Sequence, residues 1–194
     1  MKLSLKTAPA EEPVTLAEAK IQLHMDSDVT TEDALVTSII VAARQYVESF
    51  TGRALVTQTW YAYLDEFPCD DFVELPFGEL QSVTSVKTKD YQGDETTLTV
   101  TTQYLVDSES EPGRIVLPYS VSWPSLDPYP FNPITIEFIC GYGGASAVPD
   151  SLKHAIKLMV GDLYKNRETR LDKQQYDNDA AVNLMYPYRL WNVY

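Results

Sequence analysis

The sequence TTEDALVTSIIVAARQYVESFTG, residues 30–52, predicts a long amphipathic helix that decides the fold. Its apolar side chains recur at three- and four-residue spacing, which lines one helical face: Leu35, Val36, Ile39, Ile40, Ala43, Val47 and Phe50. Thr30 followed by Asp33 resembles a capping box, and Gly52 stands where a left-handed C-cap ends a helix. A helix of roughly 30 Å needs other elements to cover this face.

Two further segments have helical periodicity and can cover that face. The first begins at a capping box formed by Thr15 and Glu18. The second begins at Asp150, directly after Pro149. Its apolar face consists of Leu152, Ala155, Ile156, Met159, Val160 and Leu163. Residues 1–13 show no such pattern and are interpreted as a flexible arm.

Between the second and third helices, polar and apolar residues alternate as they do in strands. Strands are predicted at residues 56–64, 72–75, 83–89, 96–100, 104–107, 114–117 and 134–140. In the last strand, alternate side chains from Ile134 to Cys140 face the core. Prolines are too frequent in residues 118–133 for regular structure, so this loop is a candidate contact surface.

The predicted fold class is therefore α+β, a three-helix core with an inserted antiparallel β region and an extended C-terminal tail. Residues 1–53 hold the N-terminal arm and the first two helices, and residues 54–148 hold the β region. Residues 149–170 form the third core helix, and residues 171–194 form a tail for docking. The final NLMYPYRLWNVY is too aromatic to stay in water, so it packs on its own domain or on another chain.

The charge balance restricts the function. Lys and Arg total 15 and Asp and Glu total 28, which gives a formal charge of −13. This charge repels a phosphate backbone at long range and disfavours a sequence-specific DNA-binding protein, although an acidic surface can still line a path for DNA. No apolar run is long enough to span a membrane. Cys69 and Cys140 share no motif and are interpreted as a buried pair of free thiols.

No constellation of residues indicates an active site. The glycine-rich residues 141–146 lack the third glycine and the lysine of nucleotide-binding loops, which favours a turn. His24 and His154 have no catalytic or zinc-binding partners nearby. The spacing of four acidic residues does not match that of a calcium-binding loop, and we interpret them as the solvated rim of a hairpin: Asp65, Glu66, Asp70 and Asp71. We therefore expect no catalytic residue, no cofactor and no metal, and expect that the protein is not an enzyme.

Aromatic residues in the β region leave two interpretations open. They are Tyr61, Tyr63, Tyr119, Trp123, Tyr129 and Phe131. They can serve as interface residues, or they can form a sugar-stacking platform in a carbohydrate-binding or hydrolytic accessory protein.

Six motifs, in order and spacing, resemble the tailed-bacteriophage head–tail connector, or adaptor, family. They are VTLAEAKIQL (14–23), EDALVTSIIVAARQYVESFTGRALVTQTW (32–60), VELPFGELQSVTSVK (73–87), YLVDSESEPGRIVLP (104–118), ITIEFICGYG (134–143) and VPDSLKHAIKLMVGDLYKNRE (148–168). The most specific part is the ARxYxExxTGRxLxxQTW block, residues 43–60. The resemblance is to the branch with a β region inserted between helices, and it does not extend to residues 171–194.

The resemblance implies a structural virion protein of the head–tail neck, made in the host cytoplasm and without contact to a membrane. Such adaptors form a homo-oligomeric ring, typically a dodecamer, beneath the portal protein. The ring extends the DNA channel, DNA passes without specific binding, and a stopper or tail-completion protein docks on it. A stopper, or another neck protein, is the alternative within this class, but the three-helix frame favours the adaptor.

The docking residues expected from this resemblance lie in two places. Portal docking is expected of the C-terminal residues Tyr186, Tyr188, Arg189, Leu190, Trp191 and Tyr194. A ring or tail-side interface is expected of Tyr119, Trp123, Tyr129 and Phe131, with the turns at residues 90–95 and 108–113 beside them.

Overall fold

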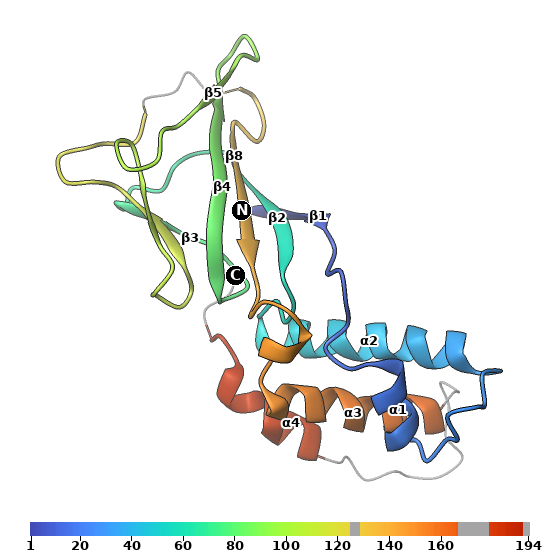
Figure 1. Ribbon diagram of the computed structural model, residues 1–194. Helices are drawn as coiled ribbons and strands as arrows, with labels where there is room; N and C mark the ends of the chain where they lie inside the picture. Colours follow the sequence, from blue (N-terminus) through green and yellow to red (C-terminus); the bar gives the residue numbers. More distant parts are fainter. Residues whose placement is uncertain (125–128, 167–178, 192–194) are drawn as a thin grey trace. The chain divides into compact units, whose positions relative to one another are not determined.

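The computed structural model describes residues 1–124, 129–166 and 179–191 (Figure 1). The described residues form two compact units. The β unit holds residues 1–9 and 57–142, and the helical unit holds residues 10–56 together with those from 143 onward. This division differs from the expected ranges at the N-terminus, where residues 1–9 belong to the β unit.

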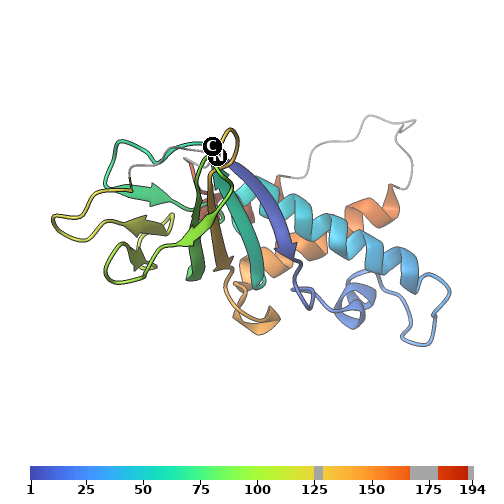
Figure 2. The same ribbon diagram turned by 90° about the horizontal axis from the view of Figure 1, so that it is seen from above.

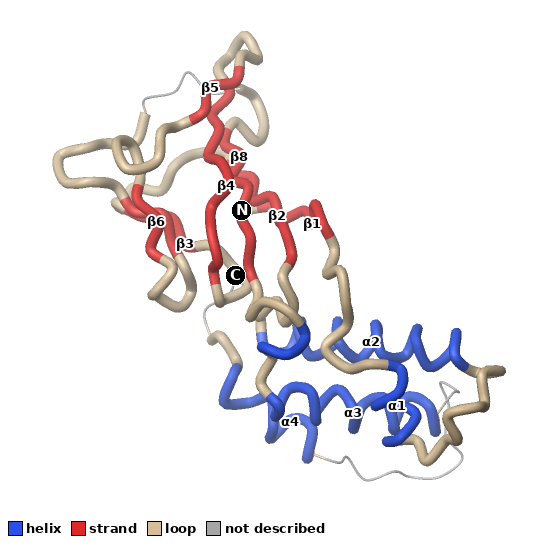
Figure 3. The backbone as a smooth tube through the Cα atoms, in the orientation of Figure 1, coloured by secondary structure: helices blue, strands red, loops and turns tan. Residues whose placement is uncertain are grey.

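The helical unit is built on α2, Asp33–Thr51, which packs against α3, Asp150–Lys165, and α1, Leu16–Gln22 (Figure 3). A short helix, α4 (Ala180–Met185), also packs on α3. The helices predicted from periodicity are present, and α2 buries most of the expected face: Val36, Ile39, Ile40, Ala43 and Val47. The opposing buried residues of α3 are Leu152, Ala155, Ile156 and Val160. Leu35 and Leu163 were expected on these faces but are exposed, since each lies near the end of its helix.

The helix ends follow the predicted signals with one exception. The Thr15–Glu18 capping box is present, and Gly52 ends α2 in the left-handed region at φ 70°. The capping box predicted at Thr30 is wrong, because α2 has Glu32 at its N-cap and no side chain caps it. Asp33 lies instead 2.6 Å from the buried Lys20 Nζ of α1. A buried ammonium group requires a carboxylate partner, which explains the different use of Asp33.

Charged residues of the block at residues 43–60 form hydrogen bonds near the C-terminal end of α2. The buried Arg44 donates from Nε to Glu12 at 2.7 Å and from Nη1 to Glu48 at 2.6 Å. The other carboxylate oxygen of Glu48 accepts a hydrogen bond from the backbone N–H of Leu55 at 3.0 Å. These bonds fix the direction in which the chain leaves α2.

The β unit contains two antiparallel sheets (Figure 2). The five-stranded sheet has the order β1-β2-β8-β4-β5, and the three-stranded sheet has the order β3-β7-β6. The strands are β1 (Lys2–Thr7), β2 (Gln58–Leu64), β3 (Phe72–Glu74), β4 (Leu80–Lys89), β5 (Glu95–Thr97), β6 (Leu105–Asp107), β7 (Arg114–Val116) and β8 (Ile134–Cys140). All seven strands predicted in the inserted region are present.

The flexible arm expected over residues 1–13 is wrong for its first half. Residues 2–7 form β1, which pairs with β2 in the register Lys2 to Tyr63 and Leu3 to Ala62. The sequence KLSLKT alternates polar and apolar residues and suits an edge strand. The N-terminus is therefore part of the sheet.

Strand β8 supplies the centre of the β core. Ile134, Ile136, Phe138 and Cys140 are fully buried, as predicted. The strand lies between β2 and β4, which places Phe138 opposite Trp60 and Val83. Both cysteines are free, but only Cys140 is buried, and Cys69 is exposed on a turn. The expectation of two buried thiols is correct for Cys140 alone.

Candidate docking surfaces

The C-terminal aromatic segment lies against its own helical unit. Met185 of α4 is fully buried, and the chain continues into the 3-10 turn Tyr186–Tyr188. Arg53 Nε donates to the carbonyl oxygen of Tyr188 at 2.6 Å, and the N–H of Leu190 donates to the carbonyl oxygen of Thr51 at 2.8 Å. The last turn of α2 and the residue after Gly52 therefore hold this segment in place. It is anchored, and in its described part it is not an extended tail.

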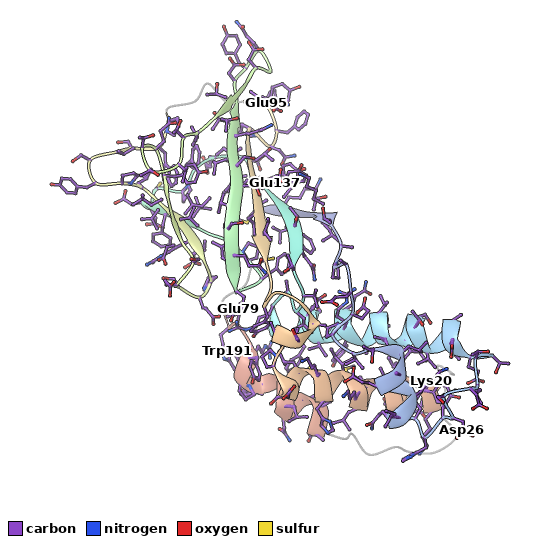
Figure 4. The ribbon with its side chains drawn as sticks, in the orientation of Figure 1. Lys20, Asp26, Glu79, Glu95, Glu137 and Trp191 are labelled. Atoms are coloured by element: carbon purple, nitrogen blue, oxygen red, sulfur yellow. The ribbon has the colours of Figure 1, made fainter. Side chains whose placement is uncertain are left out.

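Three exposed side chains of this segment, Tyr186, Arg189 and Trp191, lie beside the half-buried Phe50 of α2, and we call these four residues the aromatic cluster. The rings of Tyr186 and Trp191 meet edge to face with centroids 5.4 Å apart. The Arg189 guanidinium lies 5.1 Å from the Phe50 ring and 5.1 Å from the Trp191 ring. Trp191, labelled in Figure 4, is 65% exposed and Tyr186 is 51% exposed. Side chains of these types supply most of the binding energy at protein interfaces.

The other C-terminal residues expected in portal docking differ in exposure. Tyr188 and Leu190 are half-buried, and Arg189 is exposed. Tyr194 lies outside the described residues. The exposed members of the expected set are therefore Tyr186, Arg189 and Trp191.

The proline-rich loop divides its aromatic residues between two settings. The side chain of Tyr119 is 99% exposed and projects into solvent. Trp123 stacks on Phe67 with centroids 4.5 Å apart, and its Nε1 donates to the carbonyl oxygen of Asp70 at 2.9 Å. These contacts use the ring face and the polar edge of Trp123, which weakens the hypothesis of a sugar-stacking platform built on that tryptophan.

The second pair from this loop lies on the five-stranded sheet. Tyr129 and Phe131 meet edge to face with centroids 5.0 Å apart. The Lys89 Nζ of β4 lies 5.1 Å from the Tyr129 ring. Phe131 is exposed, and both rings line an open groove of about 600 Å³ on the sheet surface.

Lysine and tyrosine side chains line this groove, on the sheet face opposite the buried residues of β8. We call this surface the lysine–tyrosine face; it comprises the groove residues Lys2, Tyr61, Tyr63, Lys87 and Lys89, together with Lys6, which pairs with Glu137 beside them. Cross-strand register places Lys2, Tyr63, Thr135 and Lys87 in one row across four strands. The next row contains Ser4, Tyr61, Glu137 and Ser85. The sequence analysis missed this surface, because its lysines lie far apart in the chain and only the register brings them together.

Two carboxylates lie within the lysine–tyrosine face, and Figure 4 labels both. Glu137 lies 2.6 Å from Lys6 Nζ, and this hydrogen bond raises the pKa of Lys6 above its usual value. Lys6 Nζ also lies 5.2 Å from the Tyr61 ring. Glu95 lies 3.4 Å from Lys87 and 3.6 Å from Lys89. The face is therefore cationic overall, with its lysines spaced by acidic groups.

The loop at residues 141–146 binds a carboxylate of its own chain. Gly141 and Gly143 adopt positive φ, and the 3-10 turn Ala145–Ala147 follows them. The N–H of Ala145 donates to the Glu11 carboxylate at 2.7 Å. A carboxylate of the same chain therefore occupies a donor that a bound phosphate would need.

The remaining candidates for chemistry are dispersed. Asp65 accepts a hydrogen bond from the N–H of Asn132 at 3.0 Å, and His154 is exposed on α3. Within residues 1–124, 129–166 and 179–191, no group of three or more metal-ligating side chains comes together. Among the same residues, no helix is long and apolar enough to cross a membrane.

Comparison with known families identifies the chain. The sequence matches the model of the Phage gp6-like head-tail connector protein family over residues 13–112. The chain belongs to this family. The matched region includes α1, α2, the block at residues 43–60 and the strands from β2 to β6. The identification expected from sequence motifs is confirmed, and with it a structural role at the head–tail neck of a virion. No curated protein matches the sequence.

Solved structures show that this connector shares its whole fold with chains of virion and neck structures. Three of them are titled "Neck of empty GTA particle computed with C6 symmetry", "Virion of native gene transfer agent (GTA) particle" and "Neck of native GTA particle computed with C12 symmetry". Their TM-scores are 0.84, 0.81 and 0.81, at 23%, 23% and 24% sequence identity. Each match covers 100% of this chain and 98% of the other. The α+β fold class is confirmed.

Proposed function

We propose that this connector assembles as a homo-oligomeric ring beneath the portal protein, without enzymatic activity. The ring extends the DNA channel and presents a surface to which a stopper or tail-completion protein docks. The observation that carries the proposal is the family membership, together with a fold shared over the full chain with neck structures computed with C6 and C12 symmetry. Twelve copies is the stoichiometry that the second of these symmetries suggests.

The aromatic cluster is proposed as the contact to the portal. Its exposed Trp191 and Tyr186 offer apolar area, and Arg189 offers a charge already held between two rings. Because Arg53 and Thr51 fix the backbone beside the cluster, docking loses little conformational freedom. The matching portal surface is an apolar pocket with a carboxylate at its edge.

The tail-side contact is proposed for the exposed aromatic residues of the β unit. Tyr119 and Phe131 are the members of the expected set with most of their surface in solvent. The turns at residues 90–95 and 108–113 are proposed to lie beside them. The acidic balance of −13 supports a channel through which DNA slides without specific binding.

The portal contact is tested by alanine substitution and a binding measurement. We expect Tyr186→Ala/Trp191→Ala to weaken binding to the portal of the same phage by about 100-fold, since two anchor side chains are removed. Tyr46→Ala, which removes from α2 a ring as exposed as that of Tyr186, is the control and should leave binding unchanged. Equal affinity of the double variant and the wild type would refute the portal assignment of this cluster.

A further inference from the structure

We propose that the lysine–tyrosine face binds the acidic loop, residues 26–31 between α1 and α2, of a neighbouring copy of this chain. The proposal rests on the proposed ring and names the two surfaces that join its protomers. The lysine–tyrosine face lies in the β unit, and the acidic loop lies in the helical unit.

The distribution of charge favours contact between these two surfaces. The lysine–tyrosine face carries Lys2, Lys6, Lys87 and Lys89 against Glu95 and Glu137, a local balance of 4 − 2 = +2. The whole chain has −13, so the remainder carries −13 − 2 = −15. A cationic face on such an acidic chain is complementary to most of the surface of a second copy, and it attracts the copy by long-range electrostatics.

The acidic loop is exposed and its backbone is held in place. Asp26 and Asp28 are exposed, and the loop and the adjacent α1 present Val29 at 39% and Ile21 at 74% exposure. The buried Lys20 Nζ donates to the carbonyl oxygens of Val29 at 2.8 Å and Ser27 at 3.4 Å. Figure 4 shows Lys20 and Asp26 at this end of the helical unit. The loop is therefore held in one shape before it meets a partner, which lowers the entropic cost of binding.

The two surfaces carry complementary types of side chain. Two carboxylates precede an exposed apolar residue in the loop, and lysines lie beside the half-buried rings of Tyr61 and Tyr63 in the groove. Ion pairs at the rim around apolar contact at the centre is the usual arrangement of a protein interface. The two surfaces differ, so the contact is heterologous, and heterologous contacts generate rings when the rotation closes.

Duplex DNA is a poorer occupant of the same face. Glu137 and Glu95 lie among the lysines and contact three of them, at 2.6 to 3.6 Å. These carboxylates would repel the continuous rows of phosphate groups on a duplex more strongly than they repel the two carboxylates of the acidic loop. DNA binding is nevertheless one of the outcomes that the experiment separates.

The experiment reverses charge on each surface of the full chain. The face variant is Lys2→Glu/Lys87→Glu, with a formal charge of −13 − 4 = −17. The loop variant is Asp26→Lys/Asp28→Lys, with a formal charge of −13 + 4 = −9. Ring formation is measured by sedimentation velocity and negative-stain imaging, alone and with the portal of the same phage.

A control variant makes the same change of charge as the loop variant at a different place. Asp150→Lys/Asp162→Lys replaces two exposed aspartates of α3 and also gives −13 + 4 = −9. It therefore separates an effect of net charge from an effect of the acidic loop. Thermal melting of every variant verifies that it folds.

We expect each reversal to reduce the fraction of chain in rings by about tenfold, because attractive pairs become repulsive ones. An equimolar mixture of the face and loop variants should recover rings, since the two alternate with opposite charges in contact. The four-residue combination, which restores −13, should also recover them. The control should assemble like the wild type.

The contrary outcomes are distinct. Wild-type rings that neither reversal affects, or a loss that mixing does not reverse, would overturn this interface and leave the proposed ring standing. Absence of wild-type rings even with the portal would overturn the proposed function itself, and this inference with it. Rings unaffected by the face variant, combined with loss of its binding to a fluorescent DNA duplex, would assign the face to DNA.

Discussion

Arg53 Nε donates a 2.6 Å hydrogen bond to the carbonyl oxygen of Tyr188, which joins residues 135 positions apart in the chain. Arg53 directly follows the Gly52 cap of α2 and is buried. The bond therefore connects the most specific motif of the sequence to the segment that carries the aromatic cluster. It gives Arg53 a structural role that its place in the motif alone does not explain.

Removing this connection should loosen the C-terminal segment. We expect Arg53→Ala to lower the free energy of unfolding by about 2 kcal/mol, the cost of losing a buried charged donor. Portal binding should weaken as well, because the aromatic cluster loses its fixed backbone. Hydrogen exchange at residues 185–190 measures the loosening. Unchanged exchange in Arg53→Ala would show that the segment is held by other contacts.

The pair of Lys20 and Asp33 should stabilise the helical unit. Lys20→Met leaves the Asp33 carboxylate without its cation at 2.6 Å and frees the acidic loop. We expect a loss of about 2 kcal/mol in urea denaturation, since a partly buried ion pair is broken on one side. The double variant Lys20→Met/Asp33→Asn should lose less stability than the sum of the losses of the two single variants. Strict additivity would mean that the two side chains do not interact.

The capping box of α1 should make stability depend on pH. The N–H of Thr15 and then Lys157 lower the pKa of Glu18 to about 2, from an ordinary value of 4.5. A carboxyl group with a depressed pKa contributes stability above pH 4.5 and loses it as the pH falls through about 2. Glu18→Gln should therefore melt at a lower temperature than the wild type at pH 6, and the difference should shrink towards pH 2. Glu66→Gln, a change at an exposed residue that follows β2, is the control. A constant difference across this range would contradict the assignment.

The β unit should not accommodate a side chain at position 113, where the chain passes close to Leu80 of β4. A Cβ on Gly113 would lie 2.3 Å from the Leu80 Cβ, so one backbone must move. We expect Gly113→Ala to lower the free energy of unfolding by about 3 kcal/mol, as overpacking of a core does. Gly161→Ala is the matched control, because its Cβ would meet no atom within 4 Å. Equal stability of the two variants would contradict the packing described.

Local patterns predicted much of the fold because they report local physics. The alternation around Phe138 identified β8, and Gly52 identified the end of α2. Two errors came from interactions between distant residues. Asp33 was assigned to a cap because the sequence does not show that it pairs with Lys20. The packing of α1 against α2 brings these two side chains together. Residues 2–7 were assigned to an arm because a six-residue alternation is a weak signal until β2 pairs with it.

The sequence predicted which residue types form the candidate surfaces, but it did not predict where these residues lie in the fold. The aromatic C-terminus indicated an interface, but its attachment through Arg53 and Thr51 required the fold. Trp123 and Tyr119 looked alike in sequence, whereas the structure stacks Trp123 on Phe67 and leaves Tyr119 in solvent. The lysine–tyrosine face arises from strand register, which a single sequence does not determine.

The central claim, a connector ring on the portal, is tested most directly by imaging the purified chain mixed with the portal protein of the same phage. Negative-stain images and native mass spectra of the mixture should show a closed ring of this chain, typically of twelve copies, stacked on the portal ring. A chain that stays monomeric in the presence of assembled portal, with no added density on the portal, would contradict the account.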